Sequence, residues 1–234
     1  MSRGLGDVYK RQIHATGTPV VIVIVNGKPL NNEWITKNIP TIVDVWEPGM
    51  YGGQALAEIL FGEVNPSGKL PITIPKHAGQ IPMYYYQRPS RYWTGYGLGS
   101  SGEDEKPAFC FGHGLSYTSY EYSGLKIDSV IPQTQDIEFT FTVKNTGNMA
   151  GKETALVFIR DCVSSVVTPV ACLKGFEKVS LNPGESKDIR IVIPYSDLGL
   201  WNEDMKYVVE SGKFNLMIGR SVEDIRIKKD FFIK

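Results

Sequence analysis

Residues 42–75 constrain the fold of this chain more than any other stretch. An apolar run at 42–46 ends at a Pro-Gly pair, and a Gly-Gly pair then opens an expected helix at 52–61. A glycine ends that helix, and a Pro-Ser-Gly turn leads into an expected short strand at 70–74. Strand, helix and strand in this order predict a βαβ crossover, the unit from which parallel sheets are built.

Further elements of the same type precede this unit. The apolar run at 20–25 predicts a central parallel strand that is buried on both faces, and it ends at an Asn-Gly turn. A short helix is expected at 32–38 and a second strand at 39–46. About three strands and two helices are too few to cover both faces of a doubly wound sheet. We therefore expect a partial α/β/α sandwich with a mostly parallel sheet, whose first half is absent.

The N-terminal residues 1–12 are unlike the sequence that follows. They have no apolar core of the kind that a signal peptide needs, and no clear helix or strand period. They are typical of a non-native, adapter-derived leader in assembled sequence data. We expect the natural sequence to begin near Ile13, and leave open whether the truncation is natural or an assembly artefact.

From residue 120 onward the pattern becomes all-β. Residues 137–143 alternate between apolar and polar side chains and end at an Asn-Thr-Gly turn. Further strands are expected at 155–160, 179–181, 188–193, 207–210, 213–218 and 225–228. About seven short strands with turn signals every 8–12 residues predict an immunoglobulin-like β-sandwich. Because no Cys–Trp–Cys arrangement is present, a fibronectin III-like module is favoured over an antibody-type domain.

The two expected modules are joined by a long loop at 77–116, rich in Gly, Tyr, Pro and Ser. Its aromatic and basic cluster is typical of sugar binding, because aromatic faces contact sugar C–H surfaces and Arg hydrogen-bonds to hydroxyls. The candidate substrate-binding residues are Tyr85, Arg88, Arg91 and Trp93. The alternative, which we favour, is a loop that packs between the two modules.

The charge balance excludes several classes of partner. Lys and Arg together number 25, as do Asp and Glu, so the net charge is zero and gives no reason to expect nucleic acid or an anionic membrane. The longest apolar run, 20–25, is too short to span a bilayer. Three cysteines without CxxC spacing argue against a disulfide framework or a zinc site and favour buried thiols. A pair between Cys162 and Cys172 stays open.

Two carboxylates and one serine are candidate catalytic groups. Asp44 and Glu47 lie near the expected carboxyl end of a strand, where sites in such sheets usually form. They need not converge, and Glu47 beside a proline is more simply a solvated side chain. Ser116 follows Gly-His-Gly-Leu but lacks the GxSxG order of a nucleophile elbow.

Metal and nucleotide binding have weaker support still. The three histidines are scattered and show no ligand spacing, so we expect no metal site; they are His14, His77 and His113. Glycines 49, 52 and 53 could open a phosphate-binding turn at a helix start. Without a GxGxxG or GKS/GKT pattern, close backbone packing explains these glycines better.

Seven ordered blocks of sequence resemble the C-terminal portion of glycoside hydrolase family 3, from about residue 13 to the end. They are TPVVIVIVNGKPL (18–30), WEPGMYGGQALAEILFGEVNPSGKLPITIP (46–75), GQIPMYY (79–85), FGHGLSYTSYEYSGL (111–125), VKNTGNMAGKETALVFIRD (143–161), LKGFEKVSLNPGES (173–186) and DMKYVVESGKFNLMIG (204–219).

The resemblance implies the C-terminal half of an α/β/α sandwich domain at 13–116, followed by a fibronectin type III-like domain at 117–234. It implies that the parent is a β-glycosidase that releases terminal glucosyl or xylosyl residues from oligosaccharides or glycosides with retention, without a cofactor. Family members carry the nucleophile on an N-terminal barrel and the acid/base glutamate upstream of the strand at 20–25. No catalytic residue can therefore be assigned to this chain, which we expect to be inactive alone.

The resemblance leaves several points open. Cys110 stands where the family often has proline, His113 stands where tyrosine is common, and the loop at 86–106 departs from the common short version. The sugar, the linkage and the oligomeric state are therefore not assigned. A periplasmic or secreted location is expected for the parent, with a cytoplasmic one open. The rival interpretations are a non-catalytic carbohydrate-binding or structural module and a small self-sufficient hydrolase.

Overall fold

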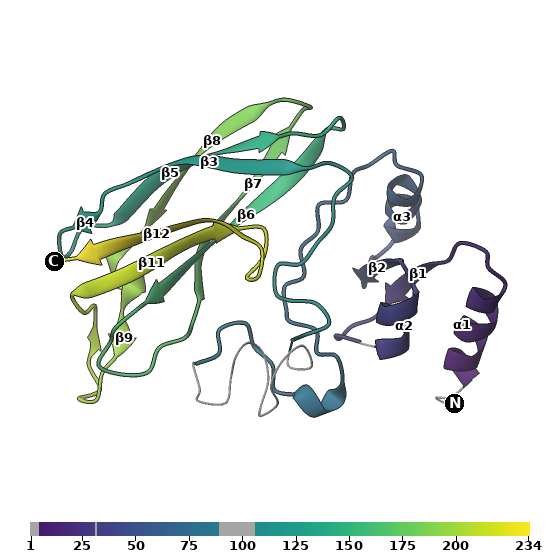
Figure 1. Ribbon diagram of the computed structural model, residues 1–234, viewed down its shortest axis with the longest axis horizontal. Helices are drawn as coiled ribbons and strands as arrows, with labels where there is room; N and C mark the ends of the chain where they lie inside the picture. Colours follow the sequence, from purple (N-terminus) through teal and green to yellow (C-terminus); the bar gives the residue numbers. More distant parts are fainter. Residues whose placement is uncertain (1–4, 31, 89–105) are drawn as a thin grey trace.

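The computed structural model describes residues 5–30, 32–88 and 106–234. Figure 1 shows a small α/β layer on the N-terminal side and a larger β-sandwich on the C-terminal side. Two stretches, which we call the connecting segments (63–88 and 106–119), run between them.

The elements of the α/β layer are short. In chain order they are α1 (Leu5–Ala15), β1 (Val21–Val25), α2 (Glu33–Asn38), β2 (Thr41–Trp46) and α3 (Gly52–Leu60), followed by the 3₁₀ turn η1 (Ala78–Gln80). Among the described residues no helix is both long and apolar enough to cross a membrane.

Strands β1 and β2 pair in parallel, as the apolar runs predicted. Val21 lies opposite Thr41, and the register continues until a bulge places Val25 opposite Trp46. Trp46 adopts a left-handed backbone with φ of 52° at this end of the sheet. The described part of this sheet has two strands, so the expected larger parallel sheet is not confirmed.

The prediction that residues 70–74 form the last strand of the βαβ crossover is wrong. This segment does not join β1 and β2; it pairs in antiparallel fashion with the second connecting segment. Leu70 N–H donates to the carbonyl of His113 at 2.9 Å, and Ile74 N–H donates to that of Phe109 at 2.8 Å. Pro71 and Pro75 lack an N–H, so the segment can bond along one side only, which suits an edge rather than the middle of a sheet.

The N-terminal segment also differs from expectation. Residues 5–15, for which no helical period was predicted, form α1. His14 packs edge-on against Trp34 of α2, with ring centroids 5.5 Å apart, and the guanidinium of Arg11 lies 5.0 Å from the centroid of the same indole. The interpretation of residues 1–12 as a leader stays a prediction.

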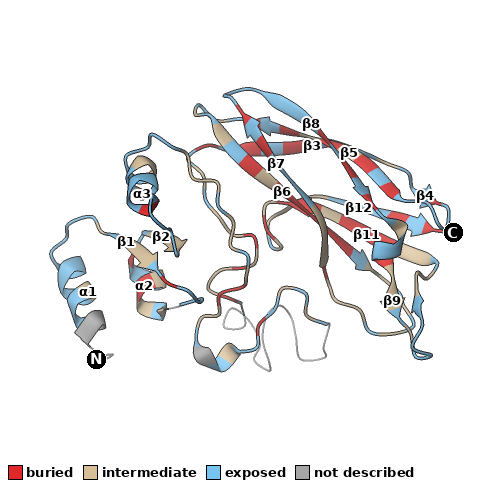
Figure 2. Cartoon of the chain, turned by 180° about the vertical axis from the view of Figure 1, so that it is seen from behind, coloured by how far each residue is buried: buried red, intermediate tan, exposed pale blue. Residues whose placement is uncertain are grey.

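Helix α3 begins and ends near the predicted residues, and Gly62 in a left-handed conformation (φ 78°) follows it. Its apolar face is only partly covered, because Leu56 and Ile59 are half-buried and Leu60 is exposed. Phe61, just beyond the helix, is 84% exposed. Figure 2 shows the same contrast at larger scale, with buried residues concentrated in the sandwich.

The sandwich consists of a five-stranded sheet in the order β4-β12-β11-β6-β7 and a three-stranded sheet in the order β3-β5-β8, with a small β9–β10 hairpin. The bounds are β3 (Tyr120–Ile127), β4 (Val130–Ile131), β5 (Ile137–Asn145), β6 (Gly151–Asp161), β7 (Cys172–Leu181), β8 (Ser186–Ile193), β9 (Leu200–Trp201), β10 (Tyr207–Val208), β11 (Gly212–Gly219) and β12 (Ile225–Ile233). Every strand expected from the sequence in this part is present. The turn η3 (Tyr195–Leu198) follows β8.

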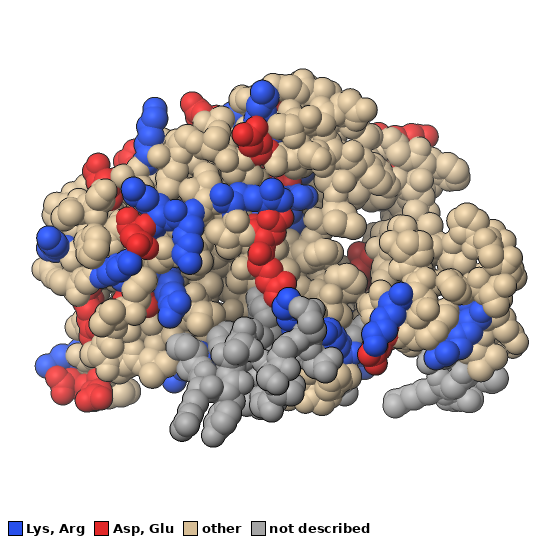
Figure 3. All heavy atoms as spheres, in the orientation of Figure 1, with Lys and Arg blue, Asp and Glu red and all other residues tan. Residues whose placement is uncertain are grey.

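The main core lies between the two sheets and follows the alternation seen in the sequence. In β5, Phe139 and Phe141 are 1% exposed and lie on the inner face, while the intervening Thr140 and Thr142 point outward. Burying each such phenylalanine contributes about 1.5–3 kcal/mol to folding. Figure 3 shows charged side chains of both signs intermixed over the sandwich surface, in keeping with the zero net charge.

Strand β6 is buried on both faces. Val157 and Ile159 point into the main core, whereas Leu156 and Phe158 belong to a second apolar cluster on the outer side of the sheet. Tyr85 and Phe111 of the connecting segments pack against that cluster. The connecting segments are therefore packed onto the sandwich.

Candidate functional site

The tyrosine run predicted as a sugar-binding cluster places its members on opposite sides. Tyr85 is half-buried; its ring stacks on Phe111 at 4.2 Å between centroids and meets Phe158 edge-on at 6.0 Å. Its hydroxyl accepts from the N–H of Leu173 at 3.4 Å, and burial raises the pKa of this phenol. Tyr85 therefore binds the connecting segment to the sandwich, which is the packing role that we favoured.

Tyr84 and Tyr86 point away from that contact. They are 53% and 48% exposed, and their rings stack on one another with centroids 5.4 Å apart and planes 22° apart. Side chains alternate along an extended segment, so residues 84 and 86 share a face that 85 does not. This two-residue alternation is the sequence signal that could have distinguished the exposed Tyr84 and Tyr86 from the packed Tyr85.

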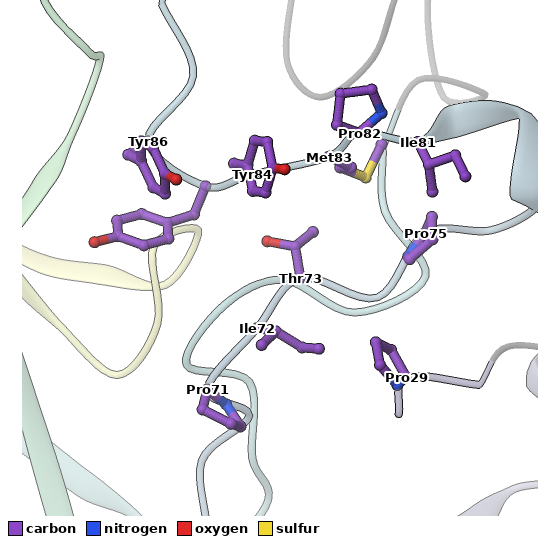
Figure 4. Close-up of a pocket in the computed structure, with 11 residues that line it drawn as sticks. Pro29, Pro71, Ile72, Thr73, Pro75, Ile81, Pro82, Met83, Tyr84 and Tyr86 are labelled. Atoms are coloured by element: carbon purple, nitrogen blue, oxygen red, sulfur yellow. The ribbon is translucent and has the colours of Figure 1, made fainter. Parts of the chain in front are cut away.

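A groove of about 470 Å³ opens beneath these tyrosines. Figure 4 shows Tyr84 and Tyr86 on one wall and the segment from Pro71 to Pro75 on the other. The lining residues are Pro29, Pro71, Ile72, Thr73, Pro75, Ile81, Pro82, Met83, Tyr84, Tyr85 and Tyr86.

Of the other predicted binding residues, Arg88 is exposed beyond the groove. Arg91 and Trp93 lie outside the described residues, as does most of the loop at 86–106. Their role in binding substrate stays a prediction.

The two carboxylates considered for catalysis make local contacts. An oxygen of Asp44 accepts from the N–H of Trp46 at 3.2 Å, which fixes the turn at the end of β2. Glu47 is exposed, and its Oε1 lies 2.7 Å from the point where a Cβ on Gly27 would stand. Asp44 thus has a structural task, and Glu47 lies over the glycine that follows β1.

The remaining candidates are also accounted for by structure. Ser116 Oγ donates to Asn65 Oδ1 at 2.9 Å, so its hydroxyl links the two connecting segments. A Cβ on Gly52 would stand 2.4 Å from Pro48 Cβ, so close packing explains that glycine. The same explanation is wrong for Gly49 and Gly53, because nothing lies within 4 Å of their Cβ positions; Gly49 has a left-handed backbone with φ of 68°. Among the described residues no group of three or more His, Cys, Asp or Glu side chains could hold a metal ion.

A buried charge cluster joins the connecting segment at 63–88 to the sandwich, and no sequence pattern predicted it. Glu153 of β6 is 1% exposed and lies 3.1 Å from Lys69 and 3.5 Å from Arg220. The hydroxyl of Tyr122 donates to the same carboxylate at 3.1 Å. Burial lowers the pKa of Lys69, and the Glu153 carboxylate opposes that effect. Burial also raises the pKa of Tyr122, and Glu153 raises it further.

Comparisons with known proteins agree with this architecture. The model of the glycosyl hydrolase family 3 C-terminal domain matches residues 6–117, and that of a fibronectin type III-like domain matches 153–222. Residues 6–117 belong to glycosyl hydrolase family 3. We call them the family 3 module below.

Relatives of the family 3 module and its sandwich include enzymes acting on two kinds of glycoside. A beta-xylosidase of Formosa agariphila is 40% identical over 89% of this chain, and a periplasmic beta-glucosidase of Salmonella typhimurium is 38% identical over 94%. The chain spans 29% of the length of each relative.

Solved structures of β-glucosidases also resemble this chain. A β-glucosidase from Erythrobacter marinus matches 96% of this chain with a TM-score of 0.89 at 36% identity. A β-glucosidase from Listeria innocua in complex with glucose matches 95% with a TM-score of 0.88 at 30% identity. The chain covers 29% and 32% of those two chains.

Two of the three expected departures from the common family 3 pattern, Cys110 and His113, lie at the joint. Cys110 is buried, and this burial raises the pKa of its thiol, while a hydrogen bond with Ser221 of the sandwich opposes the rise. His113 stands near the charge cluster; burial and then the positive charges of Lys69 and Arg220 lower its pKa. Both residues therefore face the sandwich, and all three cysteines of the chain are free.

Proposed function

We propose that this chain forms the C-terminal part of a retaining β-glycosidase that releases terminal β-glucosyl or β-xylosyl residues. The observation that carries the proposal is the match to the Erythrobacter β-glucosidase, with a TM-score of 0.89 over 96% of the chain. Because the relatives include a β-xylosidase and β-glucosidases, both sugars stay within the proposal.

In this proposal the chain itself supplies no catalytic carboxylate. Retention with a carboxylate nucleophile needs two carboxyl groups about 5–5.5 Å apart at the scissile bond. Glu153, the most buried glutamate of the described residues, is engaged by Lys69 and Arg220, and Asp44 is engaged by a backbone N–H. The family resemblance assigns the nucleophile to a barrel and the acid/base to a segment upstream of β1. The role that remains is to complete one wall of the cleft and to brace it against the sandwich.

The test is turnover of 4-nitrophenyl β-glucoside and β-xyloside. We expect the purified chain to release no nitrophenol, and we expect activity when it is produced together with the barrel domain that the proposal places before it. Glu47→Gln should leave the activity of the combined protein unchanged, since Glu47 is an exposed side chain. Turnover by the chain alone that Glu47→Gln abolishes would contradict the proposal.

One observation favours a second candidate, binding of polysaccharide by the sandwich. Trp201 and Tyr207 lie opposite one another in the β9–β10 hairpin, with ring centroids 5.5 Å apart, and are 61% and 50% exposed. Exposed aromatic faces of this kind contact sugar C–H surfaces. Retention of the chain on insoluble glucan or xylan, lost in Trp201→Ala, would support this role. Passage of the native chain without retention would exclude it.

A further inference from the structure

The groove of Figure 4 has the composition of a site for a small uncharged ligand. None of its eleven described lining residues is charged, and all but Thr73 are apolar or aromatic. Its volume of about 470 Å³ lies within the range of pockets that hold small molecules. An uncharged lining offers nothing to pair with a phosphate or a carboxylate, so the groove suits a neutral molecule.

One polar group in the groove is left without a partner. Thr73 is 7% exposed, and its hydroxyl has no hydrogen-bond partner among the described residues. Figure 4 shows this side chain rising from its segment toward Tyr84 on the opposite wall. A buried hydroxyl that pairs with nothing is unfavourable, so a ligand that brings one hydroxyl would satisfy it.

The walls favour an aromatic ring over a bare sugar. Tyr84 and Tyr86 form a stacked pair whose faces are partly exposed, and a third ring can lie against such a pair. The four prolines of the lining, Pro29, Pro71, Pro75 and Pro82, have no N–H to donate. A sugar presents several hydroxyls that each need donors and acceptors, whereas the side-chain hydroxyls of this lining come only from Thr73 and the three tyrosines.

We propose that this groove binds an uncharged aromatic ring that carries a hydroxyl group, a ligand of the phenol class. The ring lies against Tyr84 and Tyr86, and its hydroxyl exchanges a hydrogen bond with Thr73. The inference goes beyond the proposed glycosidase role because binding here requires no hydrolysis, so the two can fail separately.

The test uses 2-naphthol as the probe and the whole 234-residue chain, with binding followed by calorimetry. We expect saturable binding at one site. The double change Tyr84→Ala and Tyr86→Ala should weaken it about tenfold. The matched control is Tyr51→Ala, which removes a tyrosine that is 74% exposed outside the groove and should leave the affinity within about twofold.

A second variant tests the polar contact. Thr73→Val keeps the shape of the side chain and removes the hydroxyl, so 2-naphthol should bind about three- to tenfold more weakly. Naphthalene, which has no hydroxyl, should bind native chain and variant equally.

Four results would overturn the inference. They are no saturable binding, equal affinity in the native chain and the double variant, displacement of 2-naphthol by glucose at comparable concentration, and equal effects of Thr73→Val on both probes. Sedimentation gives a fifth: self-association of the native chain that the double variant abolishes, without naphthol binding, would mean that a second copy covers the groove.

Discussion

The carboxylate of Glu153 and the ammonium of Lys69 lie 3.1 Å apart across the joint between the family 3 module and the sandwich. Their side chains are 1% and 13% exposed, so solvent screens the pair only weakly. Arg220 and Tyr122 complete the surroundings of the carboxylate. One negative charge thus holds two cations that come from different modules.

Replacing this carboxylate should strongly destabilise the chain. In Glu153→Gln the cations of Lys69 and Arg220 stay largely buried without a counter-charge, and the expected loss is about 3–5 kcal/mol in the free energy of unfolding. The control is Glu138→Gln, which breaks an ion pair with Arg190 at 2.6 Å whose side chains are 52% and 63% exposed. That change should cost far less, because solvent screens an exposed ion pair. Equal losses in urea titrations of the two variants would contradict this account.

Gly112 should tolerate no side chain. Its φ is +83°, and a Cβ would stand 2.5 Å from Leu156 Cδ1 and 2.9 Å from the Cα of Ser221. Gly184 is the matched control, because its φ is +76° and nothing lies within 4 Å of its Cβ position. Both alanine variants bear the left-handed backbone cost of about 1 kcal/mol, but Gly112→Ala adds a steric cost of about 1–3 kcal/mol. Thermal unfolding of the two variants measures the difference, and similar midpoints would exclude a close contact at Gly112.

The acidity of Asp161 should appear in the pH dependence of stability. Burial raises its pKa to about 6, the charge of Glu210 adds to the rise, and the backbone N–H of Val163 opposes it. The folded state therefore holds this proton at pH values where the unfolded state, with an ordinary pKa of 3.8, has released it. Stability is lost as pH rises from about 4 to about 6 and stays lower above that range.

Asp161→Asn isolates this contribution. The substituted amide carries no charge at any pH. The stability of the variant relative to the native chain should therefore increase between pH 4 and pH 6.5, mostly between about pH 4 and about pH 6. Unfolding titrations at several pH values give the difference directly. A constant difference across the range would show that Asp161 titrates normally.

Replacing neighbouring tyrosines of the run by alanine should change the stability of the chain by different amounts. Tyr85→Ala removes a ring that packs on Phe111 and Phe158, and about 2–4 kcal/mol of stability should be lost. Tyr84→Ala removes a ring that is 53% exposed and should cost less than about 1 kcal/mol. The opposite order in guanidinium unfolding would mean that the exposed pair, and not Tyr85, holds the connecting segment in place.

The sandwich could be predicted from the sequence because each strand carries its own evidence. In β5, residues such as Phe139 and Phe141 alternate with threonines, and this period alone identifies both the strand and its inner face. The strands β1 and β2 were equally visible as apolar runs.

Partner choice could not be predicted, because it depends on contacts far apart in sequence. Residues 70–74 look like a strand, but their prolines permit hydrogen bonding on one side only, and the partner lies about forty residues away. The charge cluster was invisible for the same reason, since Lys69, Glu153 and Arg220 are each unremarkable alone. The family resemblance identified the modules, but the contacts between them required the structure.

Because β6 is covered on both faces, it contacts the family 3 module on one side and the main core of the sandwich on the other. Leu156 and Phe158 contact the connecting segments, while Val157 and Ile159 anchor the same strand in the main core. A displacement of the family 3 module should therefore reach the interior of the sandwich through packed side chains, and not through a flexible linker. The amides of β6 should accordingly be among the slowest to exchange with deuterium, and loosening the joint should accelerate them first.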